Sequence, residues 1–246
     1  MVLPLFQHPL SPEPSAGDSV ALVGAEAKHA IAVRRMRVGE GIQLSNGQGL
    51  RAVGEVANID GQSLTVSVSQ VMLEAKPEPA LVLVQALAKG DRDELAIQAA
   101  TELGAFAIVP WQADRSISRW DGPKIAKGVE RWQTIVAEAA KQALRAFTPR
   151  VLQPVTSKEL AKMVADYSAV LVLDPTASNS LVSANLPKLG NVAIVVGPEG
   201  GISESELELL QAAGAIRVHL GESILRTSTA GVAAISVLQS KLGHWG

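Results

Sequence analysis

Alternating apolar and polar residues at the start of the chain predict a region built mainly from β-strands. The dipeptides Asn46-Gly47 and Asp60-Gly61 have the composition of tight hairpin turns. Strands are expected at residues 19–23, 41–44, 50–59 and 63–72, and one short helix at residues 25–36. We therefore expect residues 1–73 to form a compact β-barrel with a single helix.

A different pattern begins after the polar segment 74–79, which contains two prolines and is the predicted linker. Beyond it, apolar runs alternate with longer helical segments, which predicts an α/β domain over residues 80–246, with a mainly parallel sheet between two layers of helices. The expected strands are 80–88, 105–110, 151–155, 169–173, 192–196 and 216–220. The expected helices are 91–103, 123–145, 156–165, the segment between Ser203 and Gly214, and 228–242.

Local sequence also predicts how these helices begin. Ser203 lies three residues before Glu206, which is the spacing of a capping box. Asp91 is the expected N-cap of the helix at 91–103, with Glu94 three residues further on. The last helix is apolar on nearly every side, which predicts burial either within the chain or against a second subunit.

Composition excludes several classes of protein. Of the 246 residues 47% are hydrophobic and only 3% aromatic, so a substantial core of aliphatic side chains is expected. The absence of cysteine excludes disulfides and thiol catalysis, and the four histidines show no metal-ligand spacing, so no metal is expected. No apolar run has transmembrane length and no signal peptide is recognisable, so we expect no membrane association and a cytoplasmic location.

Charge gives no indication of nucleic-acid binding over the chain as a whole. The formal net charge is −2 and the isoelectric point is about 6.1, which argues against a non-specific DNA-binding protein. Two local basic groups differ from this average; they contain Arg34, Arg35 and Arg37, and Arg115, Arg119 and Arg145. Solvated helix faces are the simpler explanation of both groups, and phosphate-binding surfaces are the alternative.

The sequence GPEGG at residues 197–201 follows one apolar run and precedes a predicted helix. It matches neither the P-loop nor the dinucleotide fingerprint. Glycines at the carboxyl end of a strand let a ligand approach the main chain, and ligands of parallel sheets bind at that edge. The loop 220–227 follows the next strand, so the two loops together predict a small-molecule site. A turn that merely needs glycine is the alternative.

Three charged residues lie in or near these loops. Arg226 lies just before the last helix, where it could bind a carboxylate, a phosphate or a base edge, or form an interface salt bridge. Glu199 and Asp174 are the best-placed carboxylates. Glu199 could act in catalysis or could cap the helix that follows the glycine loop.

The pair GPEGG and LGESILRTSTA (220–230) resembles the ribosomal RNA small subunit methyltransferase E family, within the SPOUT class of S-adenosylmethionine-dependent methyltransferases. Further matches occur in the same order along the chain, so the resemblance covers nearly all of it. They are residues 29–41, Lys89, AATELG at 99–104, Arg115-Ser116, Arg131-Trp132, and EAAKQ at 138–142 with Arg145. Either half of the motif pair would be weak by itself, but together they are specific.

The resemblance implies a PUA-like RNA-binding domain followed by an α/β domain with a deep trefoil knot near its C-terminus. It implies a homodimer with the last helix in the interface, and S-adenosylmethionine as cofactor. The implied reaction is methylation of N3 of one uridine in 16S rRNA, on the assembled 30S ribosomal subunit.

Carried onto this chain, the resemblance assigns residues to three roles. The cofactor-binding residues are Leu173, Gly197, Glu199, Gly200, Gly201, Leu220, Gly221, Ile224, Leu225 and Thr227. The RNA-binding candidates are the six arginines of the two basic groups. Arg226 is the catalytic candidate, because a cation would stabilise the uracil anion that forms when N3 loses its proton.

Two positions differ from the common family pattern. Ser223 stands where arginine is frequent, and Ser228 stands where glutamate is frequent but keeps a residue suited to an N-cap. Alternative functions are a methyltransferase of the same fold that acts on tRNA or 23S rRNA, a non-catalytic RNA-binding or assembly protein, and a nucleotide-binding regulator.

Overall fold

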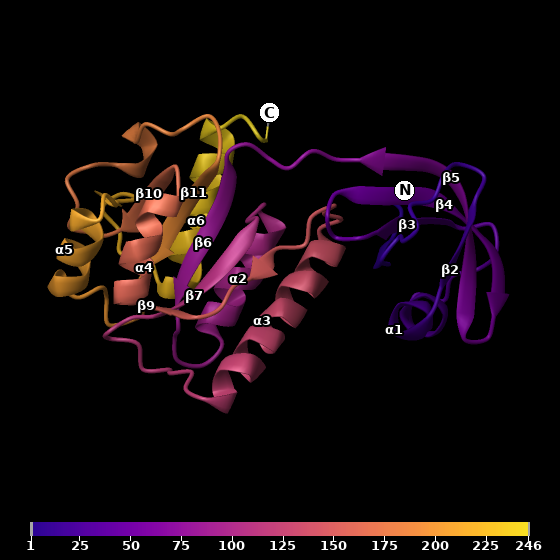
Figure 1. The fold of residues 1–246 in the computed structure, drawn as a ribbon, viewed down its shortest axis with the longest axis horizontal. Coiled ribbons are helices and arrows are strands. Elements are labelled where there is room, and N and C mark those ends of the chain that lie inside the picture. Colours follow the sequence, from indigo (N-terminus) through magenta and orange to yellow (C-terminus); the bar gives the residue numbers. More distant parts are fainter. Residues whose placement is uncertain (1, 246) are drawn as a thin grey trace. The chain divides into compact units, whose positions relative to one another are not determined.

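The computed structural model describes residues 2–245 and contains two compact units, drawn in Figure 1. The first unit comprises the chain through Lys76 together with Ala140–Thr148. The second comprises Pro77–Ala139 and the chain from Pro149 onward. Each unit has its own hydrophobic core. The inclusion of Ala140–Thr148 in the first unit is not part of the division expected from the sequence.

The first unit is a curled five-stranded sheet in the order β1-β3-β4-β5-β2. Its strands are β1 (Leu5–Gln7), β2 (Ser19–Leu22), β3 (Gly41–Ser45), β4 (Leu50–Asp60) and β5 (Ser63–Leu73). All neighbours pair antiparallel except β1 and β3, which are parallel. In residues 2–245 the edge strands β1 and β2 do not pair with each other, so the sheet is a half-barrel. The sequence pattern did not predict β1.

The single helix of this unit is shorter than expected. α1 (Gly24–Lys28) continues as a π-helical turn over His29–Val33 and stops there. Arg35 adopts a φ of 54°, outside the helical range, so the predicted continuation to Met36 does not occur. Met36 is buried in the core of the unit.

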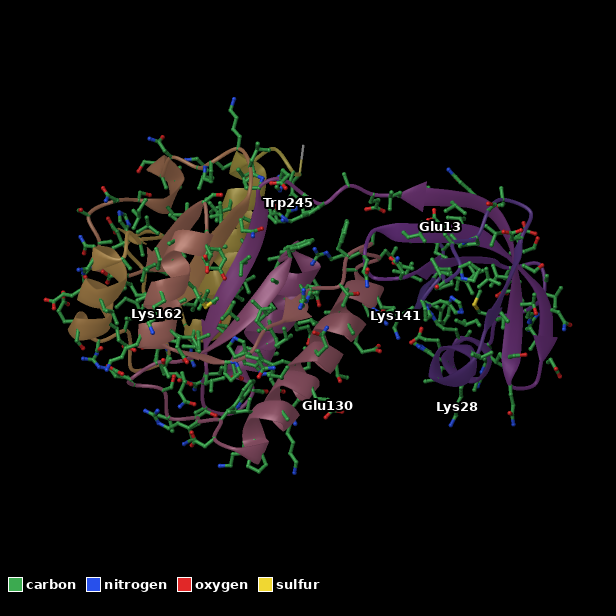
Figure 2. The ribbon with its side chains drawn as sticks, in the orientation of Figure 1. Glu13, Lys28, Glu130, Lys141, Lys162 and Trp245 are labelled. Atoms are coloured by element: carbon green, nitrogen blue, oxygen red, sulfur yellow. The ribbon has the colours of Figure 1, made fainter. Side chains whose placement is uncertain are left out.

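Polar contacts attach Ala140–Thr148 to the first unit. Lys141, labelled in Figure 2, is 5% exposed and donates a 2.9 Å hydrogen bond to Glu26 Oε1. Arg51 Nη2 donates to the carbonyl of Leu144 at 2.6 Å. These contacts involve residues far apart in sequence, which is why a local pattern did not reveal them.

The second unit contains a seven-stranded sheet in the order β12-β10-β11-β6-β7-β8, with β9 also beside β7. Its strands are β6 (Ala80–Ala86), β7 (Ala107–Gln112), β8 (Arg150–Val151), β9 (Val155–Thr156), β10 (Ala169–Leu173), β11 (Asn191–Val196) and β12 (Ile216–Val218). Every pairing is parallel, which confirms the expected sheet. The run 151–155 forms two short strands rather than the one expected.

Helices cover both faces of this sheet, as the alternating pattern predicted. They are α2 (Arg92–Glu102), α3 (Pro123–Gln142), α4 (Ser157–Met163), α5 (Glu204–Ala212) and α6 (Thr227–Lys241), with short 3₁₀ turns at Val164–Asp166 and Leu181–Ser183. Side chains of α2, α3 and α6 share one core with one face of the strands, and side chains of α4 and α5 share the other. α3 stops before the expected residue 145, since Leu144 has a φ of 54°.

The start of α2 differs from the predicted cap. Asp91 occupies the N-cap position, but its side chain makes no capping hydrogen bond. The neighbouring Asp93 is buried and accepts instead from the N–H groups of Ala88, at 3.0 Å, and Glu94. Glu94 pairs with Arg131 of α3. The predicted N-cap position of Asp91 and the N3 position of Glu94 are confirmed, but neither carboxylate caps the helix in the way their sequence suggests.

The last helix, α6, is buried along one face rather than on all sides. Gly231, Ala234, Ile235 and Leu238 are buried in the described structure. Its other face, which includes Val232, is partly exposed. The apolar sequence thus matches burial within the chain for about half of the helix surface.

Candidate functional site

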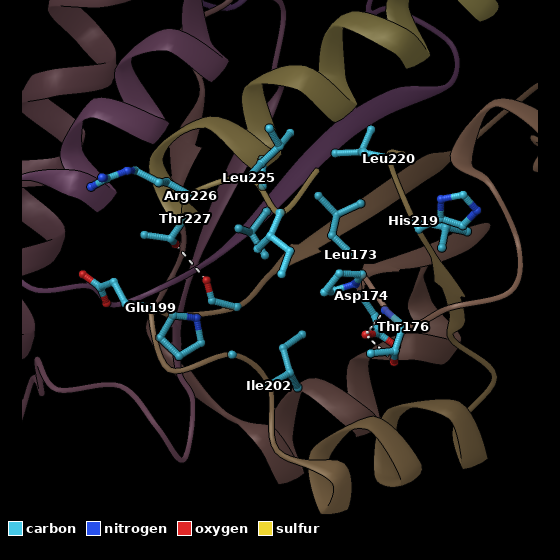
Figure 3. A pocket seen from close by; sticks show the side chains of 18 of the residues that line it. Leu173, Asp174, Thr176, Glu199, Ile202, His219, Leu220, Leu225, Arg226 and Thr227 are labelled. Atoms are coloured by element: carbon cyan, nitrogen blue, oxygen red, sulfur yellow. Dashed lines mark hydrogen bonds between the residues drawn. The ribbon is translucent and has the colours of Figure 1, made fainter. Parts of the chain in front are cut away.

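Three parallel neighbours in the sheet, β12, β10 and β11, end at the same edge, and the loops that follow them surround a cavity of about 490 Å³. The loops begin at Leu173, Val196 and Val218, and α2, α5 and α6 contribute Arg92, Leu207 and Ala230 to the lining. Figure 3 shows this cavity from close by. The cavity thus lies at the edge of a parallel sheet where the sequence predicted a small-molecule site.

The glycine loop comes close to its own following residues. A side chain at Gly197 would place Cβ 2.6 Å from Ile202 Cγ1, so only glycine allows this approach. Gly201 has a φ of 74°, and its N–H donates to the carbonyl of Pro198 at 2.9 Å. The loop therefore exposes main chain to the cavity, as the sequence predicted.

α5 begins directly after this loop with the predicted capping box. The Ser203 side chain accepts from the N–H of Glu206, and the Glu206 carboxylate accepts from the N–H of Ser203. Glu206 is 2% exposed and also accepts from Ser157 Oγ at 2.6 Å and from the N–H of Asp114 at 2.8 Å. Burial alone would raise the pKa of Glu206, but these hydrogen bonds lower it below its usual value.

An ionic contact holds the loop after β10 in place. Asp174 is 6% exposed and accepts from the N–H and the hydroxyl of Thr176, both at 2.9 Å. Arg217 Nε of β12 donates to Asp174 Oδ2 at 2.7 Å. Burial opposes ionisation of Asp174, but the Thr176 and Arg217 contacts outweigh it and lower the pKa of Asp174. Asp174 thus has a structural role in the cavity wall.

Glu199 does not cap the helix that follows the glycine loop, which was one of its two expected roles. Its Oε1 accepts from the N–H of Lys89 at 3.1 Å and from Arg92 Nη1 at 3.0 Å. These contacts join the glycine loop to the start of α2. The cap of α5 is Ser203, so the suggested helix-capping role of Glu199 was wrong.

Arg226 lies at the rim of the cavity, on the same side as Glu199 and opposite Asp174 (Figure 3). It is exposed, and within residues 2–245 its guanidinium has no hydrogen bond or ion pair. Its backbone forms the N-cap of α6. Ser228 is the second residue of that helix, so the expected N-cap role of Ser228 was wrong.

The structure gathers most of the predicted cofactor-binding residues around this cavity. Those that line it are Leu173, Gly197, Glu199, Gly201, Leu220, Gly221, Ile224, Leu225 and Thr227. Gly200 does not line it, and its carbonyl accepts from Arg115 Nη1 at 3.0 Å. That these residues bind a cofactor stays a prediction.

Other lining residues were absent from the predicted set. They include Arg92, Pro198, Ile202, Leu207 and Thr176. Pro198 and Ile202 lie in or beside the glycine motif, so the loop itself was a usable signal for them. Arg92 and Leu207 come from helices whose orientation depends on packing, and no local pattern marks them.

The predicted RNA-binding arginines fall into both units. Arg34, Arg35 and Arg37 are exposed in the first unit. Arg115 and Arg119 are exposed in the second unit. Arg145 belongs to the first unit and is partly buried, and this burial lowers its pKa to about 10.

Residues 2–245 contain no group of three or more His, Cys, Asp or Glu side chains arranged to hold a metal ion. None of their helices is both long and apolar enough to cross a membrane.

Comparison with known proteins gives two matching family models. Residues 75–239 match an RNA methyltransferase domain, and residues 22–69 match an RNA methyltransferase PUA domain. The first match alone covers more than half of the chain. The predicted α/β domain behind a PUA domain is thereby confirmed.

Individual proteins are similar over almost the full length. A ribosomal RNA small subunit methyltransferase E from Mycobacterium bovis is 39% identical, over 94% of this chain and 90% of that protein. The protein of the same name from Bacillus subtilis is 34% identical, over 89% of this chain and 88% of that protein. A crystal structure of the same enzyme from Neisseria gonorrhoeae, bound to S-adenosylmethionine, has a TM-score of 0.86 and 30% identity, with 98% of both chains covered.

Proposed function

Since the chain belongs to the ribosomal RNA small subunit methyltransferase E family, we propose that it transfers a methyl group from S-adenosylmethionine to N3 of a uridine in 16S rRNA. The observation that supports this most strongly is the cavity at the ends of β10, β11 and β12, lined by the loops that carry the family motifs. We further propose that the substrate is the assembled 30S subunit.

The cavity suits S-adenosylmethionine in size and chemistry. Its volume of about 490 Å³ lies within the range of roughly 300–1,000 Å³ usual for small-molecule sites. Leu173, Ile202 and Leu207 provide apolar surface, and the glycine loop offers main-chain groups without side chains in the way. When bound, the cofactor supplies an electrophilic methyl group.

Arg226 is the proposed catalytic residue. Uracil N3 must lose its proton to solvent before its lone pair can take the methyl group, whose bond to sulfur breaks in the same step, and the anion so formed carries its charge largely on O2 and O4. The Arg226 guanidinium at the rim has no partner within residues 2–245, so it is available to stabilise that charge. The remaining requirement is alignment of donor and acceptor, which the loops provide.

RNA binding is assigned to both units. In our proposal residues 1–73 bind RNA, 74–79 form a linker, and 80–246 carry out methyl transfer. Local arginines position the RNA, because the net charge of −2 does not favour general attraction. The RNA contacts proposed are Arg34, Arg35, Arg37, Arg115, Arg119 and Arg145.

Three further properties remain proposals that follow from the family. We propose a trefoil knot near the C-terminus and a cytoplasmic location. We also propose a homodimer that uses the partly exposed face of α6, where Val232 and Val237 provide apolar contact surface. Sedimentation at several protein concentrations tests the dimer, and Val232→Glu should shift it toward monomer.

The decisive experiment offers labelled S-adenosylmethionine with unmodified 30S subunits, naked 16S rRNA, 23S rRNA and tRNA, followed by nucleoside analysis. 3-Methyluridine formed only on 30S subunits supports the proposal. Product on tRNA or 23S rRNA alone contradicts it in favour of another substrate. Cofactor binding without any transfer points to the non-catalytic RNA-binding alternative.

An Arg226→Ala variant tests the catalytic assignment. We expect transfer to be abolished and S-adenosylmethionine affinity, measured by calorimetry, to stay within about threefold of the unchanged protein. Arg150→Ala is the matched control, since Arg150 is another exposed arginine that neither lines the cavity nor belongs to the proposed RNA contacts. Loss of cofactor binding in Arg226→Ala would assign this residue to the cofactor site instead.

A further inference from the structure

Gln85 is the only polar residue in the run Leu81–Ala88. It lies near the end of β6, the strand beside β11, and is 0% exposed. An amide buried in an apolar core is unfavourable unless it forms hydrogen bonds. The contacts of Gln85 therefore indicate what this residue contributes.

The Gln85 amide starts a short chain of hydrogen bonds that ends at the cavity. Its Nε2 donates to Thr227 Oγ1 at 2.9 Å, and Thr227 Oγ1 donates to the carbonyl of Gly197 at 2.8 Å (the latter dashed in Figure 3). The hydroxyl has a single proton, which it gives to Gly197, so it must accept from an N–H of Gln85. This requirement determines the orientation of the amide.

The amide oxygen of Gln85 forms no hydrogen bond in this orientation. Gln85 Oε1 is buried and has no hydrogen-bond partner among the described residues. An unpaired buried acceptor lowers stability, and an apolar side chain of similar volume would avoid that loss. Nε2 also donates to the carbonyl of the adjacent Ala86, at a longer 3.2 Å. The bond to Thr227 is thus the contact by which the Gln85 amide acts beyond its own strand.

The position of Thr227 suggests the benefit. Thr227 is the first residue of α6 and directly follows Arg226. One turn later, Gly231 lies so close to the sheet that an added Cβ would be 2.9 Å from Leu83 Cδ1. The start of α6 is therefore attached to the sheet by an apolar contact at Gly231 and by a polar contact to Gln85.

We propose that Gln85 is a positioning residue for methyl transfer: through Thr227 it holds the start of α6, and with it Arg226, in the orientation needed at the cavity rim. The proposal rests on the proposed function. Gln85 does not line the cavity, so its effect on the reaction is indirect.

The first test is Gln85→Met, which keeps the volume and removes the donor. Thr227 can still donate to Gly197, and removal of the unpaired oxygen offsets the loss of the 3.2 Å bond to the Ala86 carbonyl, so we expect the thermal midpoint to stay within about 4 °C. We expect kcat for transfer to 30S subunits to fall at least about tenfold, because a misplaced catalytic group lowers the rate. The KM for S-adenosylmethionine should change by less than about threefold.

Gln239→Met is the matched control, since Gln239 is a second buried glutamine and lies near the other end of α6. Its amide uses both ends: Nε2 donates to the carbonyl of Leu103 at 2.7 Å, and Oε1 is 2.7 Å from His244 Nδ1. We expect this variant to lower the thermal midpoint and leave kcat unchanged. A lower kcat in Gln85→Met and a lower thermal midpoint in Gln239→Met would together separate a positioning role from a purely stabilising one.

A Thr227 variant completes the test. Thr227→Val removes the acceptor of the Gln85 hydrogen bond and should lower kcat, and adding Gln85→Met to Thr227→Val should lower kcat no further. An unchanged kcat in Gln85→Met, or additive losses of kcat in the double variant, would overturn the positioning role of Gln85 and leave the proposed function intact. An unmodified protein that binds S-adenosylmethionine but methylates no RNA would overturn it together with the proposed function.

Discussion

The buried carboxylate of Glu206 connects three segments beside the cavity, and its removal is the most direct test of how they are held. Glu206 accepts from Ser157 Oγ, from the N–H of Asp114 and from the N–H of Ser203. The three donors come from the start of α4, the loop after β7 and the cap of α5. Ser203 also donates through its hydroxyl, at 2.9 Å, and Glu206→Ala removes all four hydrogen bonds in one step.

The expected cost follows from their number and kind. A hydrogen bond to an ionised group contributes about 1.5–3 kcal/mol, and water reaches some of the freed donors, so we expect a total loss of about 3–5 kcal/mol. For a chain of this size the thermal midpoint should then fall by about 6–20 °C. Urea denaturation followed by circular dichroism measures the free energy directly.

Lowering the pH should reduce the difference in unfolding free energy between the unchanged protein and Glu206→Ala. Because the folded-state pKa of Glu206 lies below its ordinary value of 4.5, its stabilisation is present above that value and is lost as pH falls through the folded pKa. The gap between unchanged protein and Glu206→Ala should therefore be full at pH 7 and narrow below pH 4.5. Glu208→Ala, an exposed glutamate on the same helix, is the control. A loss no larger for Glu206→Ala than for this control would refute the reasoning.

Two more predictions concern the cavity and α2. Gly197→Ala places a methyl group 2.6 Å from Ile202 Cγ1, so the glycine loop must shift. We expect the affinity for S-adenosylmethionine, measured by calorimetry, to fall at least about tenfold, and an unchanged affinity would contradict this reasoning. Burial raises the pKa of Asp93 to about 6, so the folded state binds a proton that the unfolded state does not hold at that pH. The free energy of unfolding of the unchanged protein should therefore rise relative to that of Asp93→Asn as pH falls from 7 to 5. Urea denaturation midpoints that change equally in the two proteins over this range would contradict the prediction.

Features governed by neighbouring residues were predictable from the sequence. The capping box at Ser203 needs only Glu206 three residues later, and it forms as expected. β10 occupies the predicted residues 169–173, because an apolar β-branched run between turn residues has few other conformations. The same local rules placed glycine loops after consecutive strands, and thereby most of the cavity lining.

Features governed by distant residues were not predictable. Glu94 lies at the N3 position of α2, from which it could reach back to the N-cap, but its carboxylate pairs instead with Arg131 of α3. Glu199 looks like a helix cap in sequence but contacts the start of α2. In both cases the choice between equivalent polar partners depends on which one the tertiary fold brings within hydrogen-bond distance.

The sequence by itself thus determined most of the strands and helices, the parallel sheet and the edge at which the loops surround a cavity, because periodicity and turn chemistry act over a few residues. Only the tertiary structure decided which polar groups meet at that edge. Gln85 and Thr227 are far apart in the chain, as are Asp174 and Arg217, and both contacts form near the cavity. A hydrogen bond needs its atoms about 3 Å apart, and packing sets that distance.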